Sequence, residues 1–344
     1  MENADNIQDS DFMVHTRCMT YNQENYIEDA MTGFSMQQTN FPYVAVIIDD
    51  ASTDHNADVI RNYMRQNFNM EDKSVAYMEQ HDYGDLWFAR HRTNPNCYFA
   101  TYFLKENHYQ SKKSKVPYII EWHKRAKYIA LCEGDDFWIE RNKLQRQVDF
   151  FETHPECDLV FHNALMRFQD QDRPDRIMRE FETGFFTTAQ IFEKWQLPAA
   201  SIMYRKELAD CDEMKQLLKV CTGGFLYFIA ASMRNKVYGI SECWSVYRKN
   251  KGGVSNAFSP GFCLKLDMGL AYATEDKSAI ATMDEIAVNR VYNYMPAYQK
   301  KDPKALEMVE VANSFNKNIF QKARRRYLLS LPSRAWGHFK KLFR

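Results

Sequence analysis

The sequence is poor in glycine and proline, and its cysteines form no recognisable metal or redox motif. It has 12 glycines and 10 prolines among 344 residues, below the usual shares of about 7% and 5%, which excludes collagen-like and low-complexity chains. The eight cysteines are scattered, with no Cys-x-x-Cys pair and no Cys/His spacing typical of zinc. We therefore expect reduced thiols that pack as small core side chains, as in a cytosolic protein.

Net charge and long apolar segments are also absent. Basic and acidic residues number 45 each, so no overall field attracts nucleic acid or membranes. Apolar stretches such as residues 224–233 fall short of the roughly 20 residues that span a bilayer. Residues 1–11 are polar and acidic, without the pattern of a signal peptide. We expect them to be a flexible lead and the protein to be cytoplasmic.

Apolar and aromatic side chains are plentiful and follow an α/β order in the first half. Hydrophobic residues make up 45% of the chain and aromatic residues 15%, which is ample for a core. A length of 344 residues suggests about two domains, or one large α/β domain with an appendage. Hydrophobic patterning predicts strands, several of them followed by amphipathic helices, near 12–19, 43–48, 74–79, 127–132 and 157–161. Residues 81–126 are expected to be irregular. The alternation indicates an α/β fold with a mostly parallel central sheet flanked by helices.

The second half returns to regular elements after residue 185. The patterning predicts helices near 188–195 and 222–233, and strands near 200–204 and 237–247. Residues 261–344 have a helical pattern throughout.

Two acidic loops follow predicted strands, at 49–54 and 133–136. Ligands of parallel α/β sheets bind at the carboxyl ends of the strands. The three carboxylates around Gly134 repel one another, and a divalent cation with oxygen ligands, shared with a phosphate group, would neutralise them. The alternative is a solvated turn or a helix N-cap. We favour this alternative for 49–54 taken alone, and a functional role for 133–136.

Several motifs occur in an order that resembles a known family. They are Thr20–Ile27, Ile47–Asp54, Lys127–Trp138, Lys143–Glu152 with His154–Glu156, and Ser245–Arg248 with Gly252–Ser255. Together they resemble the family 2 inverting glycosyltransferases of GT-A fold, of the bacterial polysaccharide type. The resemblance implies a Rossmann-like GT-A domain over 12–255, with a nucleotide-binding half at about 12–138 and an acceptor half at about 139–255. Residues 256–344 would form a helical C-terminal extension with a basic amphipathic tail.

The resemblance also implies roles for single residues. Tyr21 and Asp50 correspond to positions that hold the nucleoside base, with Asp50 accepting the N3–H of uracil. Thr20 and Glu24 lie in the same nucleotide-binding motif.

For the second acidic loop, the resemblance implies that Glu133 and Asp135 are a metal pair for Mn²⁺ or Mg²⁺. Asp136 and Trp138 would border the sugar and the acceptor. The implied reaction is metal-assisted transfer, with inversion, from a nucleotide-sugar to a glycan or lipid-linked acceptor. A UDP-sugar is the first choice of donor.

Two positions depart from the family pattern. The general base is usually an Asp in a stretch that opens a helix, where this sequence has Gly224, and a His often follows the Tyr-Arg pair, where it has Asn250. The base is therefore unassigned, although Asp212, Glu213 and Glu242 are near in sequence. The alternative function is a non-catalytic, sugar-nucleotide-binding or scaffold relative.

Two segments are strongly basic. Residues 112–127 would either clamp a diphosphate, dock an anionic acceptor or form a solvated loop, and we favour the loop. The tail has nine positive charges and no acidic residue after Val311. A last helix is predicted to begin at Pro332-Ser333, and residues 333–344 place aromatic and basic side chains on opposite sides.

This tail would bind an anionic membrane surface, which would make the protein peripheral on the inner face of the membrane. It would otherwise dock on its own domain or form a dimer contact. A nucleic-acid partner is disfavoured because the basic residues lack an interleaved stacking platform.

Overall fold

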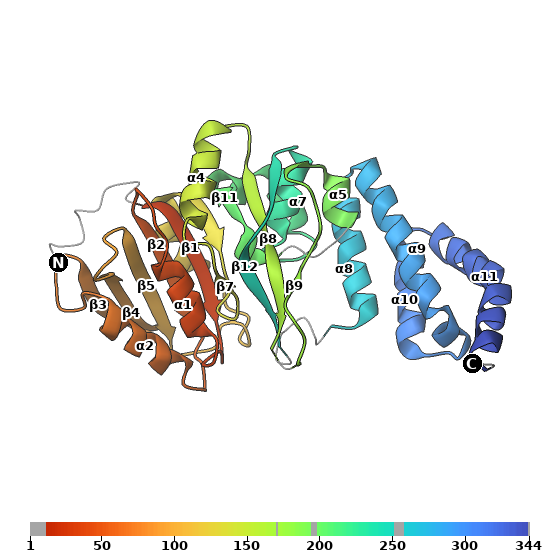
Figure 1. Cartoon of the computed structure of the whole chain (residues 1–344), viewed down its shortest axis with the longest axis horizontal. Coiled ribbons are helices and arrows are strands. Elements are labelled where there is room, and N and C mark those ends of the chain that lie inside the picture. The colour runs from red at the N-terminus through yellow and green to blue at the C-terminus, as the bar shows by residue number, and fades with distance from the viewer. Residues whose placement is uncertain (1–11, 170, 194–197, 251–257, 343–344) are drawn as a thin grey trace. The chain divides into compact units, whose positions relative to one another are not determined.

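The computed structural model describes residues 12–169, 171–193, 198–250 and 258–342, and beyond residue 330 it describes the backbone only (Figure 1). The predicted lead at 1–11 and the Gly252–Ser255 motif lie outside the described residues. The chain divides into two compact units that interleave in sequence. Unit 1 comprises residues 1–186, 196–211 and 234–250, and unit 2 comprises 187–195, 212–233 and 251–344. The domain boundaries predicted at 138 and 255 stay predictions.

Unit 1 contains the strands. They are β1 (Phe12–Thr20), β2 (Tyr43–Asp49), β3 (Ala76–His81), β4 (Gly84–Arg90), β5 (Cys97–Leu104), β6 (Ala126–Leu131), β7 (Phe137–Trp138), β8 (Leu159–Phe168), β9 (Arg176–Ile177), β10 (Gly184–Phe186), β11 (Met203–Arg205) and β12 (Val237–Lys249). Its helices are α1 (Ile27–Ser35), α2 (Asn56–Asn67), α3 (Val116–Lys124) and α4 (Lys143–Thr153), with short 3₁₀ segments η1 (Ala199–Ser201) and η2 (Lys206–Asp210).

Within the described residues these strands form one 12-stranded mixed sheet. Its main path runs β10-β12-β8-β11-β6-β1-β2-β5-β4-β3, while β7 pairs with β12 and β9 with β8. The four central strands β6, β1, β2 and β5 are parallel. Every residue of β2 is buried, as its continuous apolar run predicts for a strand covered on both faces.

Helices cover both faces of the central strands. Side chains of α1, α2 and α4, among them Phe34, Ile60 and Leu144, belong to one core cluster. Trp122 of α3 belongs to a second cluster with Val44, which lies in β2. The α/β fold class is therefore confirmed, with antiparallel strands flanking a parallel centre.

The expectation that residues 81–126 are irregular was wrong. They contain β4, β5 and α3, and β5 extends the parallel centre by pairing with β2. Seven of the eight residues of β5 are buried, and the eighth, Tyr98, is half-buried. Burial of this run stabilises β5. Its nearly continuous apolar sequence is the pattern that could have predicted a buried strand.

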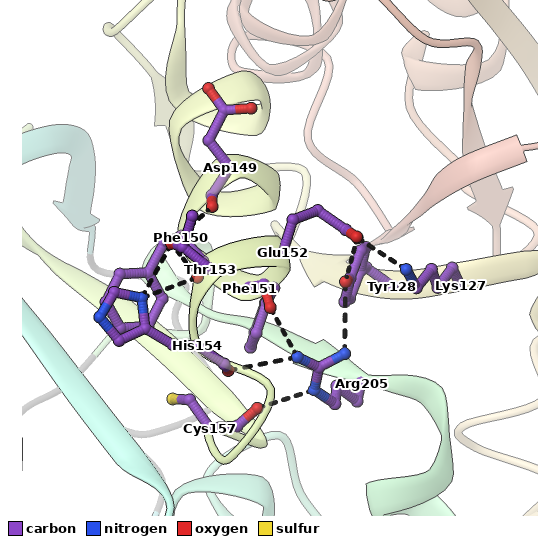
Figure 2. Close-up of polar contacts among 10 residues, drawn as sticks. All are labelled: Lys127, Tyr128, Asp149, Phe150, Phe151, Glu152, Thr153, His154, Cys157 and Arg205. Atoms are coloured by element: carbon purple, nitrogen blue, oxygen red, sulfur yellow. Dashed lines mark hydrogen bonds and ion pairs between the residues drawn. The ribbon is translucent and has the colours of Figure 1, made fainter.

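Helix α4, which follows the second acidic loop, is fixed at its C-terminus by Arg205 (Figure 2). The guanidinium donates through Nε to the Cys157 carbonyl (2.8 Å) and through Nη2 to the carbonyls of Phe151 (2.8 Å) and His154 (3.3 Å). The last carbonyls of a helix lack intrahelical donors, so a cation there satisfies them. Nη1 also donates to Tyr128 Oη at 3.3 Å, which links the helix end to β6.

Unit 2 is helical in its described residues. Its helices are α5 (Thr188–Glu193), α6 (Asp212–Leu217), α7 (Leu226–Met233), α8 (Pro260–Ala273), α9 (Lys277–Gln299), α10 (Pro303–Phe315) and α11 (Asn318–Leu342). Ser259, Asp276 and Asp302 cap α8, α9 and α10 by accepting hydrogen bonds from main-chain N–H groups. The helical C-terminal extension is thus confirmed.

The predicted start of a separate helix at Pro332-Ser333 was wrong, because α11 continues through Pro332 to Leu342. A proline removes one main-chain donor, but its φ is compatible with a helix. The side chains of residues 333–344 lie outside the described part of the structure. Among the described helices, none combines the length and the apolar character that crossing a bilayer requires.

Candidate functional site

The carboxyl ends of β1, β2, β5 and β6 meet at one edge of the sheet, where the loops that follow them are joined by hydrogen bonds. The N–H of Asp50 donates to the Thr20 carbonyl, and the N–H of Gly134 donates to the Met19 carbonyl, each at 3.0 Å. A Cβ on Gly134 would lie 2.5 Å from Gln23 Oε1 and 2.8 Å from Thr20 Cβ. Only glycine therefore fits where the loop after β6 approaches the loop after β1.

The loops after β1 and β2 are clamped together. Asn22, which has a left-handed φ of 53°, donates its N–H to Ser52 Oγ (2.9 Å) and accepts from the Thr53 N–H (2.8 Å). The N–H of Glu24 donates to Asp54 Oδ2 at 3.1 Å, and Glu24 Oε2 accepts from the main chain of the same loop at 2.9 Å. The structure thus gives Glu24, a predicted nucleotide-binding residue, a role in fixing the two loops.

The side chain of Asp49 stabilises the loop after β2 by accepting hydrogen bonds from residues that follow it. Its Oδ1 accepts from Ser52 Oγ (2.5 Å) and from Asn56 Nδ2 (2.7 Å). Asn56 Oδ1 in turn accepts from the hydroxyl of Thr20 at 3.2 Å. Burial raises the pKa of Asp49, and these hydrogen bonds oppose the rise. Thr20 is buried, so its hydroxyl acts here as a link between β1 and α2.

Asp50 is held by the loop after β5. Its Oδ1 accepts from the His108 N–H (2.8 Å), and its Oδ2 accepts from the Tyr109 N–H (3.1 Å). The Lys115 ammonium lies 2.7 Å from the same Oδ2. Sequence reasoning missed Lys115, because the basic stretch at 112–127 was the only signal and we favoured a solvated loop there.

The first carboxylate of the turn after β6 is Glu133. It is half-buried, and its Oε2 accepts from the Met19 N–H at 3.2 Å. Burial raises the pKa of Glu133, and the negative charge of Asp135 raises it further. The charges of Arg17 and Lys115 oppose this rise.

Asp135 and Asp136 are both bound by the end of β12. Asn250 Nδ2 donates to Asp135 Oδ2 at 3.3 Å, and the Arg248 N–H donates to Asp136 Oδ1 at 2.9 Å. Burial raises the pKa of both carboxyls, for Asp136 well above its usual value and with a further contribution from Asp135. The Arg248 guanidinium donates to the main-chain oxygen of Asp135 at 3.0 Å and pairs with Asp29.

Two aromatic residues were predicted to border ligands. Trp138 is 1% exposed, its Nε1 donates to the Ala200 carbonyl (2.9 Å), and its ring lies edge-on to Phe34 at 4.9 Å. This indole is part of the core, which argues against its predicted contact with a sugar or an acceptor. Tyr21 follows β1 directly and is half-buried.

A metal at this edge would depend on few protein ligands. Within the described ranges, no group of three or more His, Cys, Asp or Glu side chains is arranged to hold a metal ion. Glu133 and Asp135 are two carboxylates with raised pKa values. Such a pair fits a divalent cation that takes its remaining oxygen ligands from a phosphate group and water.

The contacts of Glu242 and Asp212, two of the carboxylates near the departures in sequence, do not identify either residue as the general base. Glu242 binds Arg146 through both of its oxygens, at 2.7 and 2.9 Å, and this hydrogen bonding lowers the pKa of Glu242. Asp212 lies at the start of α6 and pairs with Lys215 at 3.0 Å. Gly224 lies just before α7, so the segment opens a helix as expected but has no carboxylate at that position.

Comparison with known proteins places the chain near glycosyltransferases in fold. No family model matches. The uncharacterized proteins Rv1520 of Mycobacterium tuberculosis and Mb1547 of Mycobacterium bovis are each 24% identical over 236 residues, which cover 69% of this chain. The match spans only 58% of the length of these relatives. The putative teichuronic acid biosynthesis glycosyltransferase TuaG of Bacillus subtilis is 20% identical over 69% of this chain and 79% of its own length.

Among solved structures, S. aureus TarS 1–349 is similar, with a TM-score of 0.55 at 13% identity over 91% of this chain and 87% of TarS. Its complex with UDP-GlcNAc gives a TM-score of 0.57 at 14% identity, over 94% and 92% of the two chains. At such identities the similarity establishes the fold. The expected GT-A glycosyltransferase fold is therefore confirmed.

Proposed function

We propose that this protein is a glycosyltransferase that moves a sugar from a nucleotide-sugar, in the first place a UDP-sugar, to a glycan or lipid-linked acceptor. The observation that carries the proposal is the junction of the loops bearing Asp50 and Glu133–Asp136 at one edge of the parallel strands. Parallel α/β sheets bind their ligands at this edge. The similar fold of TarS, which was solved with UDP-GlcNAc, supports this class of donor.

Asp50 would select the base. Each carboxylate oxygen can accept two hydrogen bonds, and Oδ1 of Asp50 accepts one from the His108 N–H. Its remaining acceptor capacity suits an imide N–H such as N3–H of uracil. Tyr21, at the end of the neighbouring strand, would contact the base ring.

Glu133 and Asp135 would hold Mn²⁺ or Mg²⁺ together with the diphosphate of the donor. A bound divalent cation supplies positive charge that stabilises the departing diphosphate. Asn250 and the Arg248 guanidinium would hold the turn in place through the side chain and the main chain of Asp135. An in-line displacement with inversion at the anomeric carbon would follow, with the proton acceptor unassigned.

We further propose that the protein works in polysaccharide biosynthesis, as a cytoplasmic protein at the inner face of the membrane. Residues 333–344 would bind an anionic membrane surface, as the excess of basic over acidic residues after Val311 suggests. Exposed basic side chains on α11, including Lys322 and Arg325, precede this tail. Sedimentation with anionic vesicles tests the idea, because pelleting that is unchanged after truncation at Pro332 contradicts it.

The second candidate is a sugar-nucleotide-binding protein without transferase activity. Gly224, at the start of the segment that opens α7, is the observation that favours it, since glycine has no group to accept a proton. A lost general base typically lowers a rate by 10²–10⁴-fold. The two candidates therefore share donor binding and differ in turnover.

Calorimetric titration with UDP, with and without Mn²⁺, tests the shared step. We expect the wild type to bind UDP more tightly with Mn²⁺, and Asp135→Ala to remove that gain. Asp149→Ala, an exposed carboxylate on α4 that accepts from Gln145 at 2.8 Å, is the matched control and should bind as the wild type does. Absence of UDP binding by the wild type, or unchanged binding by Asp135→Ala, contradicts the proposal.

Turnover then separates the candidates. Hydrolysis or transfer of UDP-GlcNAc above a blank without enzyme, lost in Asp135→Ala and retained in Asp149→Ala, supports the transferase. Metal-dependent UDP binding with no turnover of a panel of UDP-sugars supports the non-catalytic relative.

A further inference from the structure

Lys115 is a largely buried cation at the edge of the sheet where the acidic loops meet. It is the last residue before α3, and its side chain is 18% exposed. Its ammonium lies 2.7 Å from Asp50 Oδ2, and the Asp50 side chain is 5% exposed. Lysine side chains are rarely buried unless they are paired, so this position is held by its surroundings.

Two acidic residues lie near Lys115, at the end of β1. Asp50, which pairs with Lys115, donates its main-chain N–H to the Thr20 carbonyl, and Glu133 accepts from the N–H of the preceding residue, Met19. The two acidic residues belong to the two loops that the proposed function assigns to the base and to the metal. The ammonium thus lies at the edge of the sheet where the predicted base site and the predicted metal site meet.

The loop that carries Lys115 is well anchored. Its main chain donates from His108 and Tyr109 to Asp50. Lys113 of the same loop forms an ion pair with Glu106, which precedes His108 in that loop. The two lysines therefore differ in place, because Lys113 is 55% exposed and pairs within its own loop, whereas Lys115 reaches the loop after β2.

We propose that Lys115 binds the diphosphate of the nucleotide-sugar, an inference that rests on the proposed function. A bound diphosphate would add negative charge beside Asp50, Glu133 and Asp135. An ammonium has three donors, and the contact with Asp50 uses one of them. The remaining two give charge-assisted hydrogen bonds to phosphate oxygens. Lys115 thereby supplies positive charge to a site in which both predicted metal ligands, Glu133 and Asp135, are acidic.

The competing explanation is that Lys115 only orients Asp50. The two explanations differ in the part of the nucleotide that they affect. Loss of a phosphate contact weakens binding of UDP and leaves binding of uridine unchanged. Loss of Asp50 orientation weakens both ligands to the same extent, because both contain the base.

Calorimetric titrations of the full chain with UDP and with uridine decide between them. The variants are Lys115→Met, Lys115→Gln, which keeps a donor to Asp50 without the charge, and Lys115→Arg, which keeps the charge. Lys113→Met is the matched control from the same loop. Circular dichroism melting verifies that each variant is folded, and the Gln variant replaces the Met variant if the latter does not fold.

We expect Lys115→Met and Lys115→Gln to weaken UDP binding about 10- to 100-fold, the range of a hydrogen bond to a charged group. Uridine binding should stay within about twofold in the same variants, and Lys115→Arg should retain most of the UDP affinity. An equal loss for both ligands, or no loss for either, overturns the inference. Failure of the wild type to bind UDP is a different result, because it overturns the proposed function itself.

Discussion

The loop after β2 and the turn after β6 carry the same kind of side chain in different surroundings. In the loop after β2, Asp49 and Asp50 accept hydrogen bonds from hydroxyl, amide and main-chain donors, and Lys115 pairs with Asp50. In the turn after β6, burial raises the pKa of Asp135 and of Asp136, and the charge of Asp135 raises the pKa of Asp136 further. In the first loop, the protein supplies hydrogen-bond donors and a cation to the carboxylates. In the second, three carboxylates lie close together and their pKa values are raised.

This difference indicates which of the two loops a bound ligand would stabilise more. A cation or a proton at the turn after β6 offsets the cost of burying Glu133, Asp135 and Asp136, because burial raises all three pKa values and the charge of Asp135 adds to the rise for the other two. At the loop after β2, the hydrogen bonds of Asp49 already stabilise the fold. The two loops should therefore respond in different ways to removal of a carboxylate.

The largest expected effect is on the free energy of unfolding. Asp49→Ala leaves the buried Asn56 amide without its acceptor and should destabilise the protein by about 1–3 kcal/mol. Asp135→Ala loses the hydrogen bond from Asn250 but also removes a charge that raises the pKa of Glu133 and Asp136, so stability should change by no more than about 0.5 kcal/mol. Urea unfolding without divalent cations measures both. Equal losses in the two variants would break the comparison.

A smaller effect concerns pH. Because the pKa values of Glu133, Asp135 and Asp136 are raised, the folded state binds protons more readily than the unfolded chain. Their contribution to stability is complete below the ordinary values of 3.8 for Asp and 4.5 for Glu, and it falls as the pH rises through the folded values. Asp135→Asn should therefore lose less stability than the wild type between acidic and neutral pH.

Thermal unfolding across this pH range measures the slope. Asp175→Asn is the control, because Arg167 lowers the pKa of Asp175 and the contribution of that group has the opposite sign. An Asp135→Asn variant whose stability falls as steeply as that of the wild type would contradict the assignment of repulsion to the turn.

The smallest effect sharpens the comparison within one loop. Glu106→Gln breaks the exposed pair with Lys113 and should lower the free energy of unfolding far less than Asp49→Ala does, because exposed ion pairs contribute little. High salt should reduce this cost further. Urea unfolding at low and high salt measures it, and a loss as large as that of Asp49→Ala would show that the anchoring of this loop is underestimated.

Much of the fold could be predicted from local patterns. The buried run that forms β2 and the acidic turn after β6 could be located because a strand that is covered on both faces is continuously apolar. The same pattern was present in β5 and was not recognised, because the basic and polar residues around it dominated the interpretation of 81–126.

The partners of the site residues could not be predicted in this way. Lys115, after β5, contacts Asp50, which follows β2, and Arg248 pairs with Asp29 at a separation of 219 positions. Periodicity reports on neighbours within a few residues and carries no information about such pairs. Trp138 illustrates the converse, because an aromatic residue beside an acidic turn resembled a ligand contact and is a core residue.

Residues at the C-terminal end of β12 bind the turn after β6, which is synthesised much earlier. Arg248 and Asn250 bind Asp136 and Asp135 across 112 and 115 positions, respectively. A nascent chain that ends shortly after α4 already contains the crowded carboxylates but not the donors that hold them. This edge of the molecule is therefore completed late in translation, after the first helices of unit 2 have been synthesised.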